Sequence, residues 1–166
     1  MSSFQPANDR NQIPIAEPLV EVRLGAITES RHRGHIAVVS GNGLLAAYAG
    51  FPDNVTFLRS SAKPFQAIPL VASGAADHFR FTEQEVALAC GSHNGEPIHT
   101  ELAASMLRKV GVDVSALECG VHEPYSPEAA QALRDQGEQP TALHNNCSGK
   151  HAGMLAFAKH LGAPLE

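Results

Sequence analysis

The chain has 166 residues, of which 43% are hydrophobic and 17% are charged, and its formal net charge is -5 at pH 7. This composition excludes a compositionally disordered chain, because enough apolar residues are present to build a core. The negative charge argues against a protein that binds nucleic acid, and no apolar run is long enough to span a bilayer. We therefore expect neither a nucleic-acid partner nor a membrane.

The start of the chain and its cysteines bear on the cellular compartment. Residues 1–17 include Pro6 and Pro14 and are expected to form a flexible arm, without the apolar region of a secretory signal. Three cysteines at wide spacing do not indicate a disulfide framework. Both observations favour a reducing, cytoplasmic environment.

Alternating apolar residues after this arm predict a half-buried strand over residues 19–28. Two further apolar runs, residues 35–39 and 44–48, flank an Asn42-Gly43 pair, which is a strong hairpin signal. The chain is therefore expected to open with an antiparallel ribbon of about three strands.

Helical patterns follow in the rest of the chain. The first helix is expected over residues 60–73, and Pro69 inside it should kink or shorten it, because proline removes a hydrogen bond. Thr82 and Glu85 resemble a capping box that opens a short helix ending near residue 89. Start and stop signals place three more helices over residues 97–110, 127–136 and 148–161.

Strands followed by helices predict an α+β fold in which an antiparallel sheet is covered by helices. A sheet of so few strands is too small for so many helices to pack on, and we therefore expect the sheet to be incomplete in this chain. The folded domain is expected to span residues 18–166, after the flexible arm at residues 1–17.

The first motif that carries chemistry is Arg59-Ser60-Ser61-Ala62-Lys63. On a helix Ser60 and Lys63 lie on one face, and a lysine that burial has left uncharged can take the proton of a serine. Ser60 would then be the nucleophile of an acyl-transfer reaction. The alternative is a serine that caps the helix beside a solvated Lys63, and Pro64 also biases Lys63 away from helical geometry.

A second polar motif lies at residues 90–96, between two expected helices. Its two glycines permit tight turns close to a ligand. Ser92 and His93 can donate and accept hydrogen bonds in a pocket there, and the alternative is a polar turn with a buried Cys90.

The segment at residues 144–153 is the densest in reactive groups and is expected at the start of the last helix. Cys147 is a candidate nucleophile or metal ligand, because Lys150 and a helix N-terminus favour a thiolate; the alternative is a buried structural cysteine. Each cysteine of the chain is followed closely by a histidine, and this pair of ligand types suits zinc. The usual paired-cysteine spacing of structural zinc sites is absent, which weighs against a purely structural site.

Four segments of the chain together resemble the rhizobial-type L-asparaginase family, which differs from the bacterial threonine-dependent asparaginases. They are residues 59–64, 87–93, 118–120 and, as the longest and most specific, 141–153. The resemblance implies a fold similar to that of serine β-lactamases and penicillin-binding proteins. It also implies a homodimer that hydrolyses L-asparagine to L-aspartate and ammonia.

The resemblance also implies roles for residues that match the family's motifs. Ser60 and Lys63 match a nucleophile and its base, and Ser92 matches the serine of a second pair whose lysine would lie beyond residue 166. Cys147 and Lys150 match two of three zinc ligands, and the third, a cysteine, would also lie beyond this chain. We therefore expect zinc in a full-length protein, of which this chain is the N-terminal half and inactive by itself.

Arg59, His93 and His151 are candidates for binding the α-carboxylate or carboxamide of the substrate. Two other hypotheses compete with the amidohydrolase. One is a non-catalytic fragment that binds zinc or an amino acid, and the other is a penicillin-binding-like acylase that shares the Ser-x-x-Lys motif. Glutamine stays open as a substrate, because one methylene is a small energetic difference.

Overall fold

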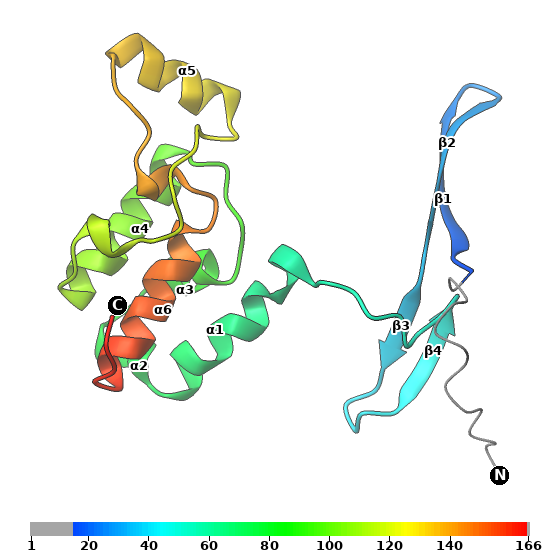
Figure 1. Ribbon diagram of the computed structural model, residues 1–166, viewed down its shortest axis with the longest axis horizontal. Coiled ribbons are helices and arrows are strands. Elements are labelled where there is room, and N and C mark those ends of the chain that lie inside the picture. Colours follow the sequence, from blue (N-terminus) through cyan, green and yellow to red (C-terminus); the bar gives the residue numbers. More distant parts are fainter. Residues whose placement is uncertain (1–14, 166) are drawn as a thin grey trace. The chain divides into compact units, whose positions relative to one another are not determined.

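The computed structural model describes residues 15–165, which contain four strands and six α-helices (Figure 1). Both kinds of element are present, so the expected α+β class is confirmed. Residues 1–14 of the expected N-terminal arm lie outside the described part of the chain. The chain divides into two compact units, one ending at Phe57 and the other beginning at Leu58.

The first unit consists of two antiparallel hairpins, each a separate two-stranded sheet. Its strands pair in chain order: β1 (Glu17–Leu24) with β2 (Ile27–Gly34), and β3 (Ile36–Val39) with β4 (Leu45–Ala49).

The expectation of a single strand over residues 19–28 was wrong. Gly25 and Ala26 form a turn that separates β1 from β2, and Gly25 has a φ of 60°, a left-handed conformation that glycine adopts without steric cost. The ribbon of three strands is therefore replaced by two hairpins. The hairpin at Asn42-Gly43 is confirmed: the Ser40 N–H donates to the Leu44 carbonyl oxygen at 2.9 Å.

The second unit is helical. Its elements are α1 (Lys63–Ala72), α2 (Ala75–His78), α3 (Glu83–Ala89), α4 (Pro97–Val110), α5 (Pro127–Gln136) and α6 (Ser148–His160), with short 3-10 turns at Arg59–Ala62, Val114–Ala116 and Ala142–His144. Over residues 15–165, no helix combines the length and the apolar character needed to cross a membrane.

Local signals placed most of these helices well. The capping box of Thr82 and Glu85 is confirmed at the start of α3, with the Glu85 N–H donating to Thr82 Oγ1 at 3.2 Å. Pro69 does not shorten α1, which continues to Ala72. The hydrogen bond that Pro69 cannot make would go to the carbonyl of Phe65; both residues are exposed, so water can satisfy that carbonyl. The short helix α2 was not predicted.

Helix α6 lies at the centre of the helical unit and packs against α1, α3 and α4 (Figure 1). Apolar side chains of all four helices form one core, which includes Leu70, Leu88, Met106, Leu107, Val110, Ala152 and Ala156. The core thus fixes α6 against α1 and α3. Helix α1 begins at Lys63, and α3 leads into the polar segment at residues 90–96.

Two glycines of α6 permit this close packing. A Cβ atom on Gly149 would lie 2.5 Å from Leu88 Cγ and 2.8 Å from the Leu88 carbonyl oxygen, so no side chain fits there. A Cβ on Gly153, one turn later, would lie 3.1 Å from Ala89 Cβ. The glycines near the end of the chain therefore serve the packing of α6 on α3 rather than loop flexibility.

Gly149→Ala is expected to lower the free energy of unfolding by about 1–3 kcal/mol, as an overpacked core does. Alanine favours a helix over glycine by about 1 kcal/mol, so any net loss reports the clash with Leu88. Urea unfolding followed by circular dichroism measures the change. Gly41→Ala is the control, because a Cβ on Gly41 meets nothing within 4 Å, and a Gly149→Ala protein as stable as the wild type would contradict the packing argument.

Candidate active site

Lys63, the first residue of α1, joins three segments that are far apart in the sequence. Its side chain is buried, with a relative exposure of 2%. Nζ donates to Ser92 Oγ at 2.8 Å and to the carbonyl oxygens of Gly91 and Asn146, each at 3.1 Å. The three sequence motifs that carry chemistry therefore meet at one amine.

This arrangement satisfies the lysine in both of its protonation states. The two carbonyl oxygens can only accept hydrogen bonds, whereas the Ser92 hydroxyl can donate or accept. An ammonium group donates to all three oxygens. A neutral amine donates to the carbonyls of Gly91 and Asn146 and uses its lone pair to accept the Ser92 O–H. The same three oxygens can therefore bond with either form of the amine, with a rotation of the Ser92 hydroxyl between the two.

Ser60 lies one turn before this amine, in the 3-10 turn Arg59–Ala62, and is exposed. Among the described residues, no hydrogen bond joins Ser60 to Lys63, whose polar contacts go to Ser92 and the two carbonyls. Arg59 has a φ of 53°, a left-handed conformation that is uncommon for a residue other than glycine. The backbone is thus strained directly before Ser60, as occurs at functional sites.

The alternative that a serine caps α1 beside a solvated Lys63 is wrong. The residue that precedes α1 is Ala62, which makes no side-chain cap, and Ser61 Oγ donates to the Leu58 carbonyl instead. Pro64 does not force Lys63 out of helical geometry, because Lys63 has φ -58° and ψ -40°. The lysine is therefore buried and helical.

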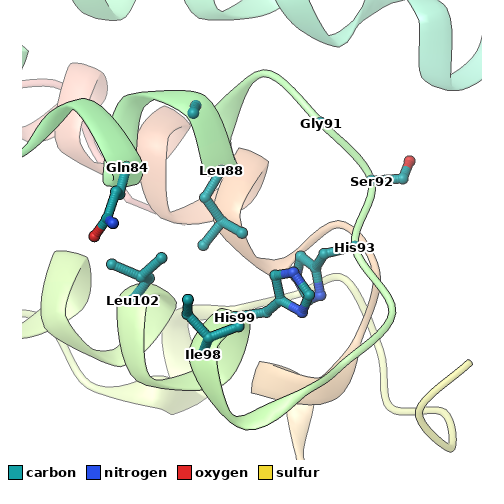
Figure 2. Close-up of a pocket in the computed structure, with 9 residues that line it drawn as sticks. Gln84, Leu88, Gly91, Ser92, His93, Ile98, His99 and Leu102 are labelled. Carbon is teal, nitrogen blue, oxygen red and sulfur yellow. The ribbon is translucent and has the colours of Figure 1, made fainter. Parts of the chain in front are cut away.

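Ser92 and His93 lie on the loop that follows α3. Figure 2 shows the Ser92 hydroxyl directed away from a cavity of about 310 Å³ whose lining includes Leu88, Ile98, His99 and Leu102. The hydroxyl bonds with Lys63, while Gly91, Ser92 and His93 also contribute to the lining of the cavity.

His93 is buried and both of its ring nitrogens are engaged. Nδ1 accepts from the Gly95 N–H at 3.1 Å, so Nε2 carries the proton and donates to Ser148 Oγ at 2.9 Å. Ser148 Oγ in turn donates to the Leu143 carbonyl at 2.9 Å. Burial is the main reason that the pKa of His93 is lowered to about 4, with His99 the next cause. His93 is therefore neutral at pH 7 and holds the loop to the start of α6.

The start of α6 carries the residues predicted to bind zinc. Cys147 is the residue that precedes the helix, and its N–H donates to Asn145 Oδ1 at 2.8 Å. Asn145 Nδ2 donates to the Cys119 carbonyl at 2.7 Å, which ties the Cys119 segment to the same turn. Burial, with Cys147 nearby, raises the pKa of the Cys119 thiol. Lys150 lies in the first turn of α6, three residues after Cys147.

A Cys147 thiolate is a common type of zinc ligand and a neutral Lys150 amine an unusual one; their three-residue spacing places both on one face at the helix start. Over residues 15–165, no group of three or more His, Cys, Asp or Glu side chains is placed to hold a metal ion. The pairing of every cysteine with a following histidine thus forms no site in that part of the chain. The Nε2 of His122, for example, accepts the Asn146 N–H at 3.1 Å.

The three predicted substrate-binding residues differ in their burial and in their hydrogen bonds. His151 is half-buried on α6, and burial first and the neighbouring Lys150 second lower its pKa. Arg59 is exposed beside Ser60, and both nitrogens of His93 are engaged within the fold. Their roles toward a substrate stay predictions. Sequence reasoning missed the carbonyls of Gly91 and Asn146, because backbone groups leave no signal in the identity of a residue.

Comparison with known proteins gives one finding that spans nearly the whole chain. A family model described as L-asparaginase II matches residues 20–166. The matched range includes the Lys63 site, the loop that carries Ser92 and the first turn of α6. No curated protein matches the chain.

Proposed function

The chain belongs to the L-asparaginase II family, a family of asparaginase-type amidohydrolases that act on a small molecule, and on that premise we propose that the full-length protein hydrolyses L-asparagine to L-aspartate and ammonia. Ser60 is the nucleophile, Lys63 is the base, and Ser92 transfers the proton between them. The observation that supports this proposal is the buried Lys63 amine, which is bonded to Ser92 and to two carbonyl oxygens.

The first half of the reaction forms an ester on Ser60. Ser60 Oγ attacks the side-chain amide carbon of asparagine and gives its proton to Ser92 Oγ, which passes its own proton to the lone pair of Lys63. The tetrahedral intermediate then expels ammonia, and Lys63 returns the proton to the leaving nitrogen. The products of this half are ammonia and an aspartyl ester of Ser60.

The second half hydrolyses the ester by the same groups. A water molecule attacks the ester carbon and gives its proton to Lys63, and the collapse of the intermediate returns that proton to Ser60 Oγ. Aspartate leaves and the free serine is restored. The carbonyls of Gly91 and Asn146 stabilise the transient ammonium in each half, because charge-assisted hydrogen bonds are stronger than neutral ones.

We also propose a zinc ion held by Cys147 and Lys150. Zinc bound there would act as an electron acceptor that keeps Cys147 deprotonated and Lys150 uncharged. The reaction steps above use only Ser60, Lys63 and Ser92. The homodimer and the cytoplasmic location expected from the sequence stay predictions.

Single-serine variants of the full-length protein test the assignment of roles. Ser60→Ala is expected to lower kcat/KM for ammonia release by about 10³-fold or more, because the nucleophile is lost. Ser92→Ala is expected to lower it by about 10²-fold, as loss of a proton-transfer group does. Ser61→Ala is the matched control and should stay within about threefold of the wild type, since its hydroxyl is engaged by the Leu58 carbonyl.

Two outcomes of this experiment would contradict the proposal. Wild-type turnover by Ser60→Ala would remove Ser60 from the nucleophile role. A protein that releases no ammonia from asparagine but is acylated on Ser60 by a β-lactam would favour the penicillin-binding-like acylase instead.

A further inference from the structure

The backbone of Asn146 supplies one of the oxygens that hold Lys63, and both its carbonyl and its N–H are engaged. The Asn146 carbonyl oxygen accepts from Lys63 Nζ at 3.1 Å and from the His93 N–H at 3.3 Å. The Asn146 N–H donates to His122 Nε2 at 3.1 Å. The backbone of Asn146 is therefore held at its carbonyl by Lys63 and His93 and at its N–H by the imidazole of His122.

The imidazole of His122 is itself fixed in orientation and tautomer. Its Nδ1 lies 2.6 Å from the Glu123 carbonyl oxygen, which can only accept, so Nδ1 carries the proton and Nε2 is the acceptor. Its ring stacks on Tyr125 with centroids 4.8 Å apart and an angle of 18° between the planes. His122 thus presents a lone pair at a fixed place, and this lone pair is already used by the Asn146 N–H.

We propose that His122 is a positioning residue for the catalytic lysine. It acts through Asn146: by accepting the Asn146 N–H, it holds the peptide plane that precedes this residue and so restricts where the carbonyl oxygen that binds Lys63 can lie. The catalytic consequence of this role rests on the function proposed above. The contact itself does not, and it can be measured without any substrate.

The position of this residue explains its expected effect. His122 lies on the segment between α4 and α5 and touches the site only through a backbone amide, so it does not contact the reacting groups. Without this acceptor the Asn146 carbonyl keeps its contact with the His93 N–H but is less firmly placed against Lys63. A displacement of the amine by about 1 Å lowers the rate of a positioned proton transfer by about 10- to 100-fold, with little effect on substrate binding.

The contact is tested directly in the unmodified protein by nuclear magnetic resonance. A scalar coupling between the nitrogen of the Asn146 amide and Nε2 of His122, across their N–H···N hydrogen bond, is expected in the ¹⁵N-labelled protein. The Nδ1 of His122 is expected to carry the ring proton. A His122 whose proton lies on Nε2, or the absence of that coupling, would overturn the proposal.

Two variants then test the consequence. His122→Leu removes the acceptor, and we expect kcat to fall about 10-fold or more with KM within about threefold, together with a shift of the Lys63 side-chain resonances. His122→Gln places an amide oxygen near the site of Nε2. This variant is expected to keep most of the wild-type kcat and the wild-type Lys63 side-chain resonances. His32→Leu, which alters an exposed histidine of the first unit, is the control.

The outcomes separate this inference from the proposed function. If the wild-type protein does not hydrolyse asparagine, the coupling and the Lys63 resonances still decide whether His122 positions the amine. If His122→Leu leaves both kcat and the Lys63 resonances unchanged, the positioning role is overturned while the amidohydrolase stands. Should His122→Leu fail to fold, the coupling in the wild type and the kcat of His122→Gln remain decisive.

Discussion

Lys63→Met is expected to lower kcat/KM for asparagine hydrolysis by about 10³-fold or more, because the amine that bonds with Ser92 is lost. Methionine is apolar and of similar length, so it can occupy the buried place of the lysine. The Gly91 carbonyl then loses its donor, while the Asn146 carbonyl keeps the His93 N–H, and the loss costs about 1–3 kcal/mol of stability. Ammonia release measures the first effect and urea unfolding the second.

Lys63→Arg separates a base from a positive charge. Arginine keeps its charge and its donors but cannot give up a proton at physiological pH. We therefore expect this variant to be as inactive as Lys63→Met. The control is Lys159→Met, which removes an exposed amine that donates to the Gly111 carbonyl at 3.1 Å. Substantial turnover by Lys63→Arg would show that the residue acts by its charge and not as a base.

Acid is expected to destabilise the helical unit through His93. The pKa of this residue is about 4 in the folded chain, against an ordinary value of 6.5, because burial disfavours the charged ring. Between these values the unfolded chain binds the proton and the folded chain does not. Stability is therefore fully present above pH 6.5 and is lost as the pH falls toward about 4, by about 3 kcal/mol in total.

Two other histidines are also expected to lower the stability of the helical unit in acid. The pKa of His144 and that of His151 are also lowered, in both cases mainly by burial. Protonation of His93 would also place an N–H against the Gly95 amide, because Nδ1 is the acceptor there. The loop that carries Ser92 is thus expected to lose its order together with the stability.

Urea unfolding at pH 7 and pH 5 measures the effect of His93. His93→Gln cannot titrate in this range, so its free energy of unfolding should vary less with pH than that of the wild type. His32→Gln, an exposed histidine with no part in this loop, should keep the wild-type dependence. Equal pH dependence in His93→Gln and the wild type would show that another group controls the acid response.

Elements marked by local signals could be predicted, and contacts between distant segments could not. The capping box at Thr82, Pro127 at the start of α5 and Gly111 after α4 each fix a helix end through interactions within a few residues. The Gly25-Ala26 turn was missed, because one glycine inside an alternating apolar run is compatible with a continuous strand.

The candidate site shows the same division. The Ser60-x-x-Lys63 spacing identified the lysine and a serine within one turn. The sequence could not show that the amine bonds with Ser92, 29 residues away, or with the carbonyl of Asn146, 83 residues away. Those contacts depend on the packing of α1 and α3 against α6. Gly149, which was assigned to a reactive segment, is instead the residue that allows this packing.

The most direct test of the mechanism is the location of the aspartyl ester. The protein is quenched with acid during turnover of saturating asparagine, digested, and analysed by mass spectrometry. We expect the ester on Ser60 in the wild type and its absence from Lys63→Arg. An ester on Ser92, or turnover of asparagine with no ester on Ser60, would contradict a Ser60 nucleophile activated by the Lys63 amine.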